Sequence, residues 1–376
     1  MPIRALEFYS GIGGLHLALT RAQPDAQVVK AFDWDQTACQ VYSANHGRIV
    51  DKVDIGLLSA SDLSKYQADI WLLSPACQPY TVLNPDAKGA QDPRAQSFLH
   101  LVQTVLPELA DSNDHPSRLL VENVAGFESS STRQILVSTM RSLGYSTLEV
   151  ILTPLQFGIP NSRLRYYFLA KKAPYRFADV PHEQADDVWR KLPGQMVDWC
   201  DPRFESSEGP ASDNSVKPIR DYLDASSEEP SPFSIPDKIL EKWGRLFDIV
   251  TPSSRRTCCF TRGYTQLVER SGSIVQENEE LQTTATFDQF LAQQSEGHDR
   301  AVEIIHPLRL RYFSPSELLR IFAFEQPSTP EREFKFKWPQ STSKKSKYKL
   351  IGNSVNVKVV EELIRYLFHE PNMVDG

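Results

Sequence analysis

The first 172 residues of the chain predict an α/β fold built on a doubly wound, mostly parallel sheet. Short β-type runs alternate there with amphipathic helical stretches, a pattern typical of such sheets. With 376 residues, 40% of them hydrophobic, the chain is long enough for one large domain and a smaller one. The expected strands are Arg4–Tyr9, Val28–Asp33, Asp69–Ser74, Arg118–Asn123, Ser146–Thr153 and Arg165–Lys171.

Amphipathic periodicity predicts helices between these strands and near the end of the chain. Apolar residues recur every three or four positions in Leu15–Ala22 and in Phe98–Leu109. Regular segments are also expected at Lys238–Ile249, Pro315–Phe324 and Val355–Phe368.

After Lys172 the regular pattern gives way to a stretch rich in Pro, Ser, Asp and Glu. We therefore expect residues 1–172 to form the sheet domain and residues 173–343 a smaller, irregular lobe that faces the substrate. Residues 344–376 are expected to return to the sheet domain. Within the lobe, the polar and glutamine-rich stretch Glu277–Arg300 predicts a mobile loop.

The composition excludes several classes of protein. No run of about 18 apolar residues occurs, and the N-terminus lacks the apolar core of a signal peptide, so neither a membrane span nor secretion is expected. An odd number of cysteines without CxxC spacing argues against zinc fingers and a disulfide framework, and it favours a reducing compartment. These cysteines are Cys39, Cys77, Cys200, Cys258 and Cys259. We expect no metal site, and a location in the cytoplasm, the nucleus or both.

The net charge of −7 neither supports nor excludes a nucleic acid, because only local charge decides contact with phosphates. Basic residues gather in two places, and each cluster also suits a solvated charged face. The clusters are Arg255, Arg256, Arg262 and Arg270, and Lys344, Lys345, Lys347 and Lys349.

A glycine-rich turn follows the first expected strand. Gly11, Gly13 and Gly14 permit a tight turn and a close approach of the backbone to a ligand at the start of a helix. A dinucleotide-binding turn would carry its third glycine at position 16, which is His16 here, so an oxidoreductase is disfavoured. The chain also lacks GxxxxGK[ST], which argues against ATP or GTP.

Three residues that end or follow the second expected strand and a third, shorter β-type run have side chains suited to binding an adenosine. Asp33 ends the second strand, where a carboxylate can bind a ribose diol. Trp34 offers a flat surface for an adenine ring, and Asp54 follows a third short run. Each of them alone also suits an ordinary surface acid or a half-buried aromatic residue.

A cysteine, a carboxyl group and two arginines are expected at the same edge of the sheet. Cys77 stands between two prolines just after Asp69–Ser74, and Glu122 ends the next strand. Arg163 and Arg165 alternate, so both project from one side of a strand. A buried thiol and a structural ion pair are the alternatives for Cys77 and Glu122.

This set of groups, together with an adenosine-bearing donor, suits methyl transfer to carbon 5 of cytosine. A thiolate that adds to carbon 6 makes carbon 5 nucleophilic, and a carboxyl group at N3 stabilises the adduct. The arginines would hold the base and a nearby phosphate and would lower the pKa of the thiol. A zinc deaminase would need H-x-E and P-C-x-x-C, and neither string occurs.

The motifs and their order resemble those of the DNA cytosine-C5 methyltransferase family. The similarity spans residues 3–368 and implies a Rossmann-like methyltransferase sheet with a smaller target-recognition lobe. The segments that carry it are Phe8–Gly14, Pro75–Tyr80, Glu122–Val124, Asn161–Arg165, Leu308–Phe324 and the Gly-Asn-Ser-Val run Gly352–Val355.

The resemblance also implies roles for individual residues. Cys77 would be the nucleophile, acting with Glu122, Arg163 and Arg165. The cofactor would be S-adenosylmethionine, with S-adenosylhomocysteine as product. Its implied contacts are Tyr9, Ser10, Gly11, Gly13, Gly14, Asp33, Trp34, Asp54, Ile55, Ser74, Pro75, Asn353, Ser354 and Val355. The implied substrate contacts are Gln78, Arg255, Arg256, Cys259, Phe260, Thr261, Arg262 and Tyr264.

Within the family, the chain is most similar to the branch that methylates transfer RNA. Cys258–Tyr264 carries the Cys-Phe-Thr signature of that branch, and Asn161 stands where the DNA enzymes usually have Gln. The resemblance implies cytosine 38 of tRNA(Asp) as the target, an exposed loop base that is easily extracted. It implies no obligate protein partner. A DNA methyltransferase and a catalytically silent nucleic-acid-binding protein are the alternatives.

One residue departs from the family pattern. Ala76 replaces the second proline of the usual Pro-Pro-Cys loop, which frees a φ angle that proline would fix. We therefore expect Ala76→Pro to leave the turnover rate intact or to raise it. Initial methylation rates of the two proteins measure this, and a rate for the variant below that of the parent would contradict it.

Overall fold

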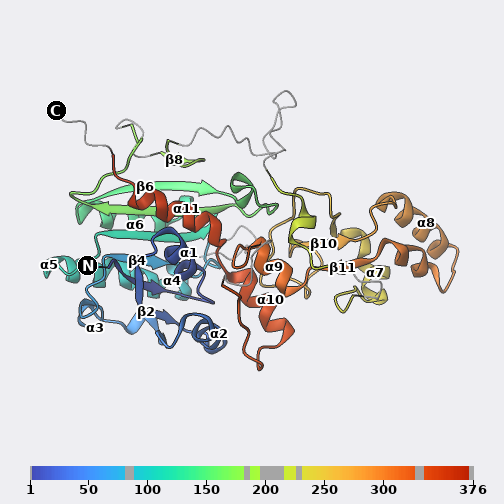
Figure 1. Cartoon of the computed structure of the whole chain (residues 1–376), viewed down its shortest axis with the longest axis horizontal. Coiled ribbons are helices and arrows are strands. Elements are labelled where there is room, and N and C mark those ends of the chain that lie inside the picture. Colours follow the sequence, from blue (N-terminus) through green and yellow to red (C-terminus); the bar gives the residue numbers. More distant parts are fainter. Residues whose placement is uncertain are drawn as a thin grey trace.

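The computed structural model describes residues 2–80, 89–181, 187–194, 216–225, 231–326 and 334–371. Figure 1 shows a large sheet domain, with a smaller lobe extending from one end of it. Within the described ranges, no helix is both long and apolar enough to cross a membrane.

The large sheet has the strand order β3-β2-β1-β4-β5-β7-β6-β8. All neighbouring strands pair in parallel except at β7, which runs antiparallel to both β5 and β6. The strands are β1 (Arg4–Phe8), β2 (Gln27–Asp33), β3 (Val50–Lys52), β4 (Ile70–Leu73), β5 (Arg118–Val124), β6 (Tyr145–Leu152), β7 (Arg165–Lys172) and β8 (Val188–Trp189). The six expected strands are thus confirmed to within two residues, and so is the doubly wound, mostly parallel fold.

Helices cover both faces of this sheet because its strands are apolar on both sides. In β1, Ala5 belongs to one hydrophobic cluster, whereas Leu6 and Phe8 belong to the other. The cluster of Ala5 contains the apolar faces of α1 (Gly14–Ala22) and α11 (Val357–Phe368), which pack together. The remaining helices of the domain are α2 (Gln36–His46), α3 (Ala60–Ser64), α4 (Pro93–His100), α5 (Leu106–Asp111) and α6 (Ser131–Ser142). A short π-helical segment, Leu101–Val105, joins α4 to α5, so the helix expected over Phe98–Leu109 is present as three consecutive segments.

The smaller lobe contains a three-stranded sheet of order β11-β10-β9. Its strands are β9 (Asp248–Val250), β10 (Ser273–Gln276) and β11 (Leu310–Tyr312). The helices at the right and centre of Figure 1 are α7 (Asp237–Trp243), α8 (Thr283–Ser295), α9 (Pro315–Ile321) and α10 (Lys344–Asn353).

The prediction of a mobile loop over Glu277–Arg300 is wrong, because α8 occupies its centre. Phe287 and Phe290 lie one turn apart on α8, and both are buried against the core of the lobe. Burial of these two side chains stabilises the helix, although the rest of the stretch is polar.

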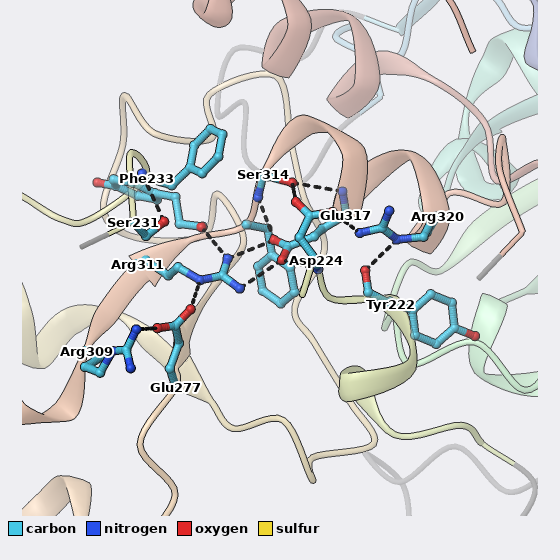
Figure 2. Close-up of polar contacts among 12 residues, drawn as sticks. Tyr222, Asp224, Ser231, Phe233, Glu277, Arg309, Arg311, Ser314, Glu317 and Arg320 are labelled. Carbon is cyan, nitrogen blue, oxygen red and sulfur yellow. Dashed lines mark hydrogen bonds and ion pairs between the residues drawn. The ribbon is translucent and has the colours of Figure 1, made fainter. Parts of the chain in front are cut away.

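A buried ion-pair network fixes the start of α9 to the small sheet (Figure 2). Arg311 of β11 donates two hydrogen bonds of 2.8 Å to the carboxylate of Glu317 in α9, and its Nε donates to Glu277. Ser314 caps α9 and donates to Asp224 through its hydroxyl. Because Arg311 and Glu317 are both buried, removing one partner alone would cost about 3–5 kcal/mol.

A second buried polar cluster lies beneath the glycine-rich turn. Glu7 of β1 accepts hydrogen bonds from the Tyr42 hydroxyl (2.7 Å) and from the backbone N–H of His16 (3.3 Å). The His46 ring stacks on His16 and lies so close to Gly13 that a Cβ there would be 2.3 Å from the ring. The cluster therefore supports the turn from below and requires glycine at position 13.

The Glu7 carboxyl gives the fold a specific pH dependence. Burial raises its pKa from 4.5 to about 8, so the folded protein holds a proton that the unfolded protein releases. Stability from this group is therefore complete below pH 4.5 and is lost as the pH rises towards 8. We expect Glu7→Gln, which has no such proton, to gain melting temperature relative to the parent between pH 5 and pH 8.5. Thermal unfolding across this range measures the difference. An exposed control, Glu108→Gln, should follow the parent, and a pH-independent difference for Glu7→Gln would contradict the assignment.

Candidate active site

Three of the predicted catalytic residues meet at the carboxyl edge of the sheet. Cys77 follows β4, Glu122 lies near the end of β5, and Arg165 begins β7. Because β7 runs antiparallel to β5, its first residue pairs with the end of β5, and Arg165 Nε comes within 3.4 Å of Glu122 Oε1. The thiol, the carboxyl and the guanidinium thus come from three adjacent strands.

Hydrogen bonds hold the loop of the nucleophile on both sides of Cys77. The Asn123 amide donates to the carbonyl of Pro75 over 3.3 Å, which ties this loop to the strand that carries Glu122. On the other side, the Tyr80 N–H donates to the Cys77 carbonyl, and the Tyr80 hydroxyl donates to Thr132. Asn123 was not among the predicted site residues, although the Glu-Asn-Val string was the signal that could have identified it.

Burial controls the ionisation of this site. It raises the pKa of the Cys77 thiol above its ordinary value, with Arg165 and Arg163 opposing the rise and Glu122 adding to it. The arginines thus lower the pKa of this thiol, as expected, but desolvation outweighs them and the net shift is upward. Burial likewise raises the pKa of Glu122 against the pull of the same arginines. Glu122 can thus keep a proton at a higher pH than an ordinary carboxyl group.

Arg163 lies close enough to Cys77 and Glu122 to lower the pKa of both, but its hydrogen bonds to oxygen go to the main chain. Its side chain is buried, with 3% of the residue exposed, and its nitrogens donate to three main-chain carbonyls. These acceptors are Phe260 (2.8 Å), Gly352 (3.1 Å) and Ser354 (2.8 Å). The prediction that both arginines hold the base and a phosphate is therefore corrected: Arg163 joins three segments of the chain, and Arg165 is the one beside Glu122.

A small cleft beside this edge collects many of the predicted cofactor residues. Gly14 and Val355 are in close contact there, since a Cβ on Gly14 would lie 2.7 Å from Val355 Cγ2. The residues that line the cleft are Tyr9, Ser10, Gly11, Ile12, Gly14, Leu15, Ser74, Asn353, Ser354 and Val355. Ile12 and Leu15 were not predicted. Leu15 had been assigned only to the apolar face of its helix.

The remaining predicted cofactor residues lie around the same turn. Asp33 accepts the N–H of Gly11 over 2.8 Å, and Trp34 beside it is 68% exposed, with the Lys52 ammonium 5.7 Å from its ring centroid. Asp54 caps the short turn that contains the buried Ile55. Pro75 is buried next to Ser74, and Gly13 is fixed by His46 as described above.

The geometry fits an adenosine-bearing cofactor. Within the described residues, the Ser10 hydroxyl is buried without a hydrogen-bond partner, as expected of a group that awaits a ligand. The unpartnered hydroxyl, the carboxylate of Asp33 and the exposed ring of Trp34 supply the donor, acceptor and stacking surface that an adenosine needs.

Two of the predicted substrate residues are buried in the core, and the others are half-buried or exposed. Phe260 and Tyr264 are 0% and 2% exposed and belong to the core, so the prediction that they face the substrate is wrong. Arg255 donates to the Val216 carbonyl, and Arg256 is exposed and pairs with Asp248 over 3.2 Å. Gln78, Cys259 and Thr261 are half-buried, and Arg262 is exposed.

Comparison with known proteins identifies the family. The model of the C-5 cytosine-specific DNA methylase family matches residues 3–369. The chain belongs to this family. It is therefore a C5 cytosine methyltransferase that uses S-adenosylmethionine.

Individual relatives agree with this assignment. A Schizosaccharomyces pombe protein named tRNA (cytosine(38)-C(5))-methyltransferase is 38% identical, and the alignment covers 98% of each chain. A Dictyostelium discoideum protein named DNA (cytosine-5)-methyltransferase is 33% identical, with 97% of this chain and 94% of that protein covered. The crystal structure of the S. pombe Dnmt2 methyltransferase superposes with a TM-score of 0.72 and 35% identity, covering 97% of this chain and 98% of that one.

The role of Arg163 as a connector can be tested with Arg163→Lys. Lysine keeps the charge but cannot reach three separate carbonyls, so we expect a loss of about 3 kcal/mol in the free energy of unfolding. The affinity for S-adenosylmethionine should fall as well, because Ser354 lines the cleft.

Chemical denaturation and calorimetric titration measure these two quantities. Arg256→Lys, a change at an exposed arginine, should leave both near the values of the parent. An Arg163→Lys protein with unchanged stability would contradict the assigned role.

Proposed function

We propose that this chain transfers a methyl group from S-adenosylmethionine to carbon 5 of cytosine 38 in a transfer RNA, with tRNA(Asp) as the substrate. The observation that carries the proposal is the meeting of Cys77, Glu122 and Arg165 beside a cleft lined by many of the predicted cofactor residues. The choice of acceptor rests on full-length similarity to relatives named as tRNA (cytosine(38)-C(5))-methyltransferases. We also propose that the protein acts in the cytoplasm, the nucleus or both.

In the proposed mechanism, the residues of the chain activate the base. The Cys77 thiol loses its proton, and its sulfur adds to carbon 6 of cytosine. Glu122 provides a proton at N3, which stabilises the electron pair displaced by this addition. Arg165 lies against Glu122 and is the guanidinium available to orient the base. Carbon 5, made nucleophilic by this addition, would take up the methyl group that the cofactor supplies. Loss of the carbon 5 proton to a base then forms the 5,6 double bond as the C6–S bond breaks, and the N3 proton returns to Glu122.

The cofactor supplies an electrophilic methyl group on a sulfonium centre. Asp33 and Trp34 would hold its ribose and adenine, and Ser10 and the turn Gly11–Gly14 would line its remaining length. The turn has no room for side chains at Gly13 and Gly14, where a Cβ would collide with His46 and Val355 respectively.

An RNA loop suits the energetics of this reaction. The target base must leave its stack before it can reach Cys77, at a cost of a few kcal/mol in a duplex, and this cost is smaller for a base that is already unpaired. The exposed arginines Arg256 and Arg262 lie on the segment that also contains Cys259. They are the candidates for contacts with phosphates near the target.

A DNA acceptor is the second candidate, favoured by the D. discoideum relative, which is named DNA (cytosine-5)-methyltransferase. The chemistry at Cys77 would be the same, so only the acceptor distinguishes the two functions.

A mechanism-based trap separates these functions. In 5-fluorocytosine, fluorine replaces the proton on carbon 5, so the adduct to Cys77 cannot eliminate and survives denaturation. We expect a denaturation-resistant complex with fluorinated tRNA(Asp) in the presence of cofactor, and none with fluorinated duplex DNA. Denaturing gel electrophoresis measures this complex.

Two controls make the trap specific. Cys77→Ala should form no complex and show no turnover, and a tRNA(Asp) with uridine at position 38 should remain unreacted. A complex with DNA alone would favour the second function, a complex with every tRNA would overturn the tRNA(Asp) assignment, and no complex with either acceptor would indicate a silent nucleic-acid-binding protein.

A further inference from the structure

The Cys259 sulfur lies between two guanidinium groups. Arg163 Nη1 is 3.4 Å from this sulfur, and Arg165 Nη2 is 3.7 Å from it. Arg165 thus contacts two groups of the site, since its Nε also lies 3.4 Å from Glu122 Oε1. Cys259 adds a third potentially anionic group to the site, beside Cys77 and Glu122.

The known groups of the site leave its positive charge unbalanced. The three hydrogen bonds from Arg163 to main-chain oxygens all end on neutral carbonyls. Glu122 must carry a proton to stabilise the base at N3, and in that state it offers no charge to Arg165. Two buried guanidinium groups would then share no full negative charge, which is costly in a poorly solvated site.

We propose that Cys259 is held as a thiolate and acts as the permanent counter-ion of Arg163 and Arg165. It is a positioning residue in this scheme, since it acts through the arginines. A fixed anion at Nη2 of Arg165 allows Glu122, which lies at Nε, to remain protonated while the guanidinium stays in place. The proposed catalytic benefit rests on the proposed function, whereas the charge state of the sulfur does not.

The two neighbouring cysteines differ in the way that this proposal requires. Burial raises the pKa of Cys259, but the two arginines and their hydrogen bonds outweigh it and bring the pKa below the ordinary thiol value. The pKa of the adjacent Cys258 is raised, by burial and by Asp248, and its contact is with the exposed Arg256 over 3.8 Å. Cys258 is therefore a matched control one residue away.

Ultraviolet absorbance of the thiolate tests the charge state without any substrate. The difference spectrum between Cys77→Ala and Cys77→Ala/Cys259→Ser, taken across pH 5–10, isolates the sulfur of Cys259. The charged groups that face it are Arg163 and Arg165, with Glu122 beside Arg165, and all of them are present in both proteins. We expect the thiolate band to be present already at pH 7. A band that appears only above about pH 8.5, as for an ordinary thiol, would overturn the proposal.

Turnover of the intact enzyme tests the positioning role. Cys259→Ser keeps the size and polarity of the side chain but not the charge, and we expect kcat to fall about 100-fold with KM for the tRNA changed less than about threefold. Cys259→Asp restores an anion and should recover kcat to within about tenfold of the parent. Cys258→Ser should match the parent.

The outcomes distinguish the two proposals. A Cys259→Ser enzyme as fast as the parent, or a folded Cys259→Asp enzyme no faster than Cys259→Ser, would overturn the positioning role. Thermal unfolding identifies a variant that does not fold, and in that case the absorbance titration decides. A parent enzyme that leaves tRNA unmodified would overturn the proposed function, but the absorbance result for Cys259 would stand.

Discussion

The buried guanidinium of Arg163 is the contact on which the rest of the site depends. Its acceptors at Phe260 and Ser354 lie 97 and 191 residues away in the chain, one in the smaller lobe and one beside the cofactor cleft. A single planar group with donors on several sides can satisfy carbonyls from both, which lysine cannot do. The backbone of Thr261 also presses on Gly352, where a Cβ would lie 2.3 Å from it. The lobe segment that contains Phe260 and Thr261 and the segment beside the cleft are therefore held as one unit.

This arrangement assigns different tasks to two arginines that alternate along the chain. Arg163 forms its hydrogen bonds with main-chain carbonyls, whereas Arg165 interacts more strongly with the ionisable groups Glu122 and Cys77. Burial raises the pKa values of both of these groups, which favours the protonated carboxyl and disfavours the thiolate. The Cys77 thiol and the Glu122 carboxyl thus favour their uncharged forms before the base arrives. Stabilisation of charge by Arg165 is then concentrated where the reaction needs it.

The fold was predictable from sequence because its strands are short, apolar and separated by amphipathic helices, as in β1, β4 and β5. The carboxyl-edge position of Cys77 and Glu122 followed from the same pattern, since residues that end parallel strands share an edge. Side-chain direction in the irregular lobe was not predictable. Phe260 and Tyr264 sit in a basic segment, yet both are buried, because the lobe needs large apolar side chains to form a core. The hydrogen bonds of Arg163 were not predictable either, since their acceptors are main-chain oxygens far away in the chain, which any residue type can supply.

The nucleophile loop shows how a departure from the family pattern is accommodated. Ala76 lacks the ring that would fix its φ angle. Hydrogen bonds that do not involve Ala76 nevertheless hold the residues on either side of Cys77. Asn123 fixes the carbonyl of Pro75, and Tyr80 is bonded through its N–H to Cys77 and through its hydroxyl to Thr132. The Tyr80 ring also packs edge-on against Phe127. Because β5 and α6 supply these anchors, the position of the thiol is set by the sheet domain rather than by the stiffness of the loop itself. Substitution at position 76 therefore changes the entropy of the loop more than the geometry at which the sulfur meets the base.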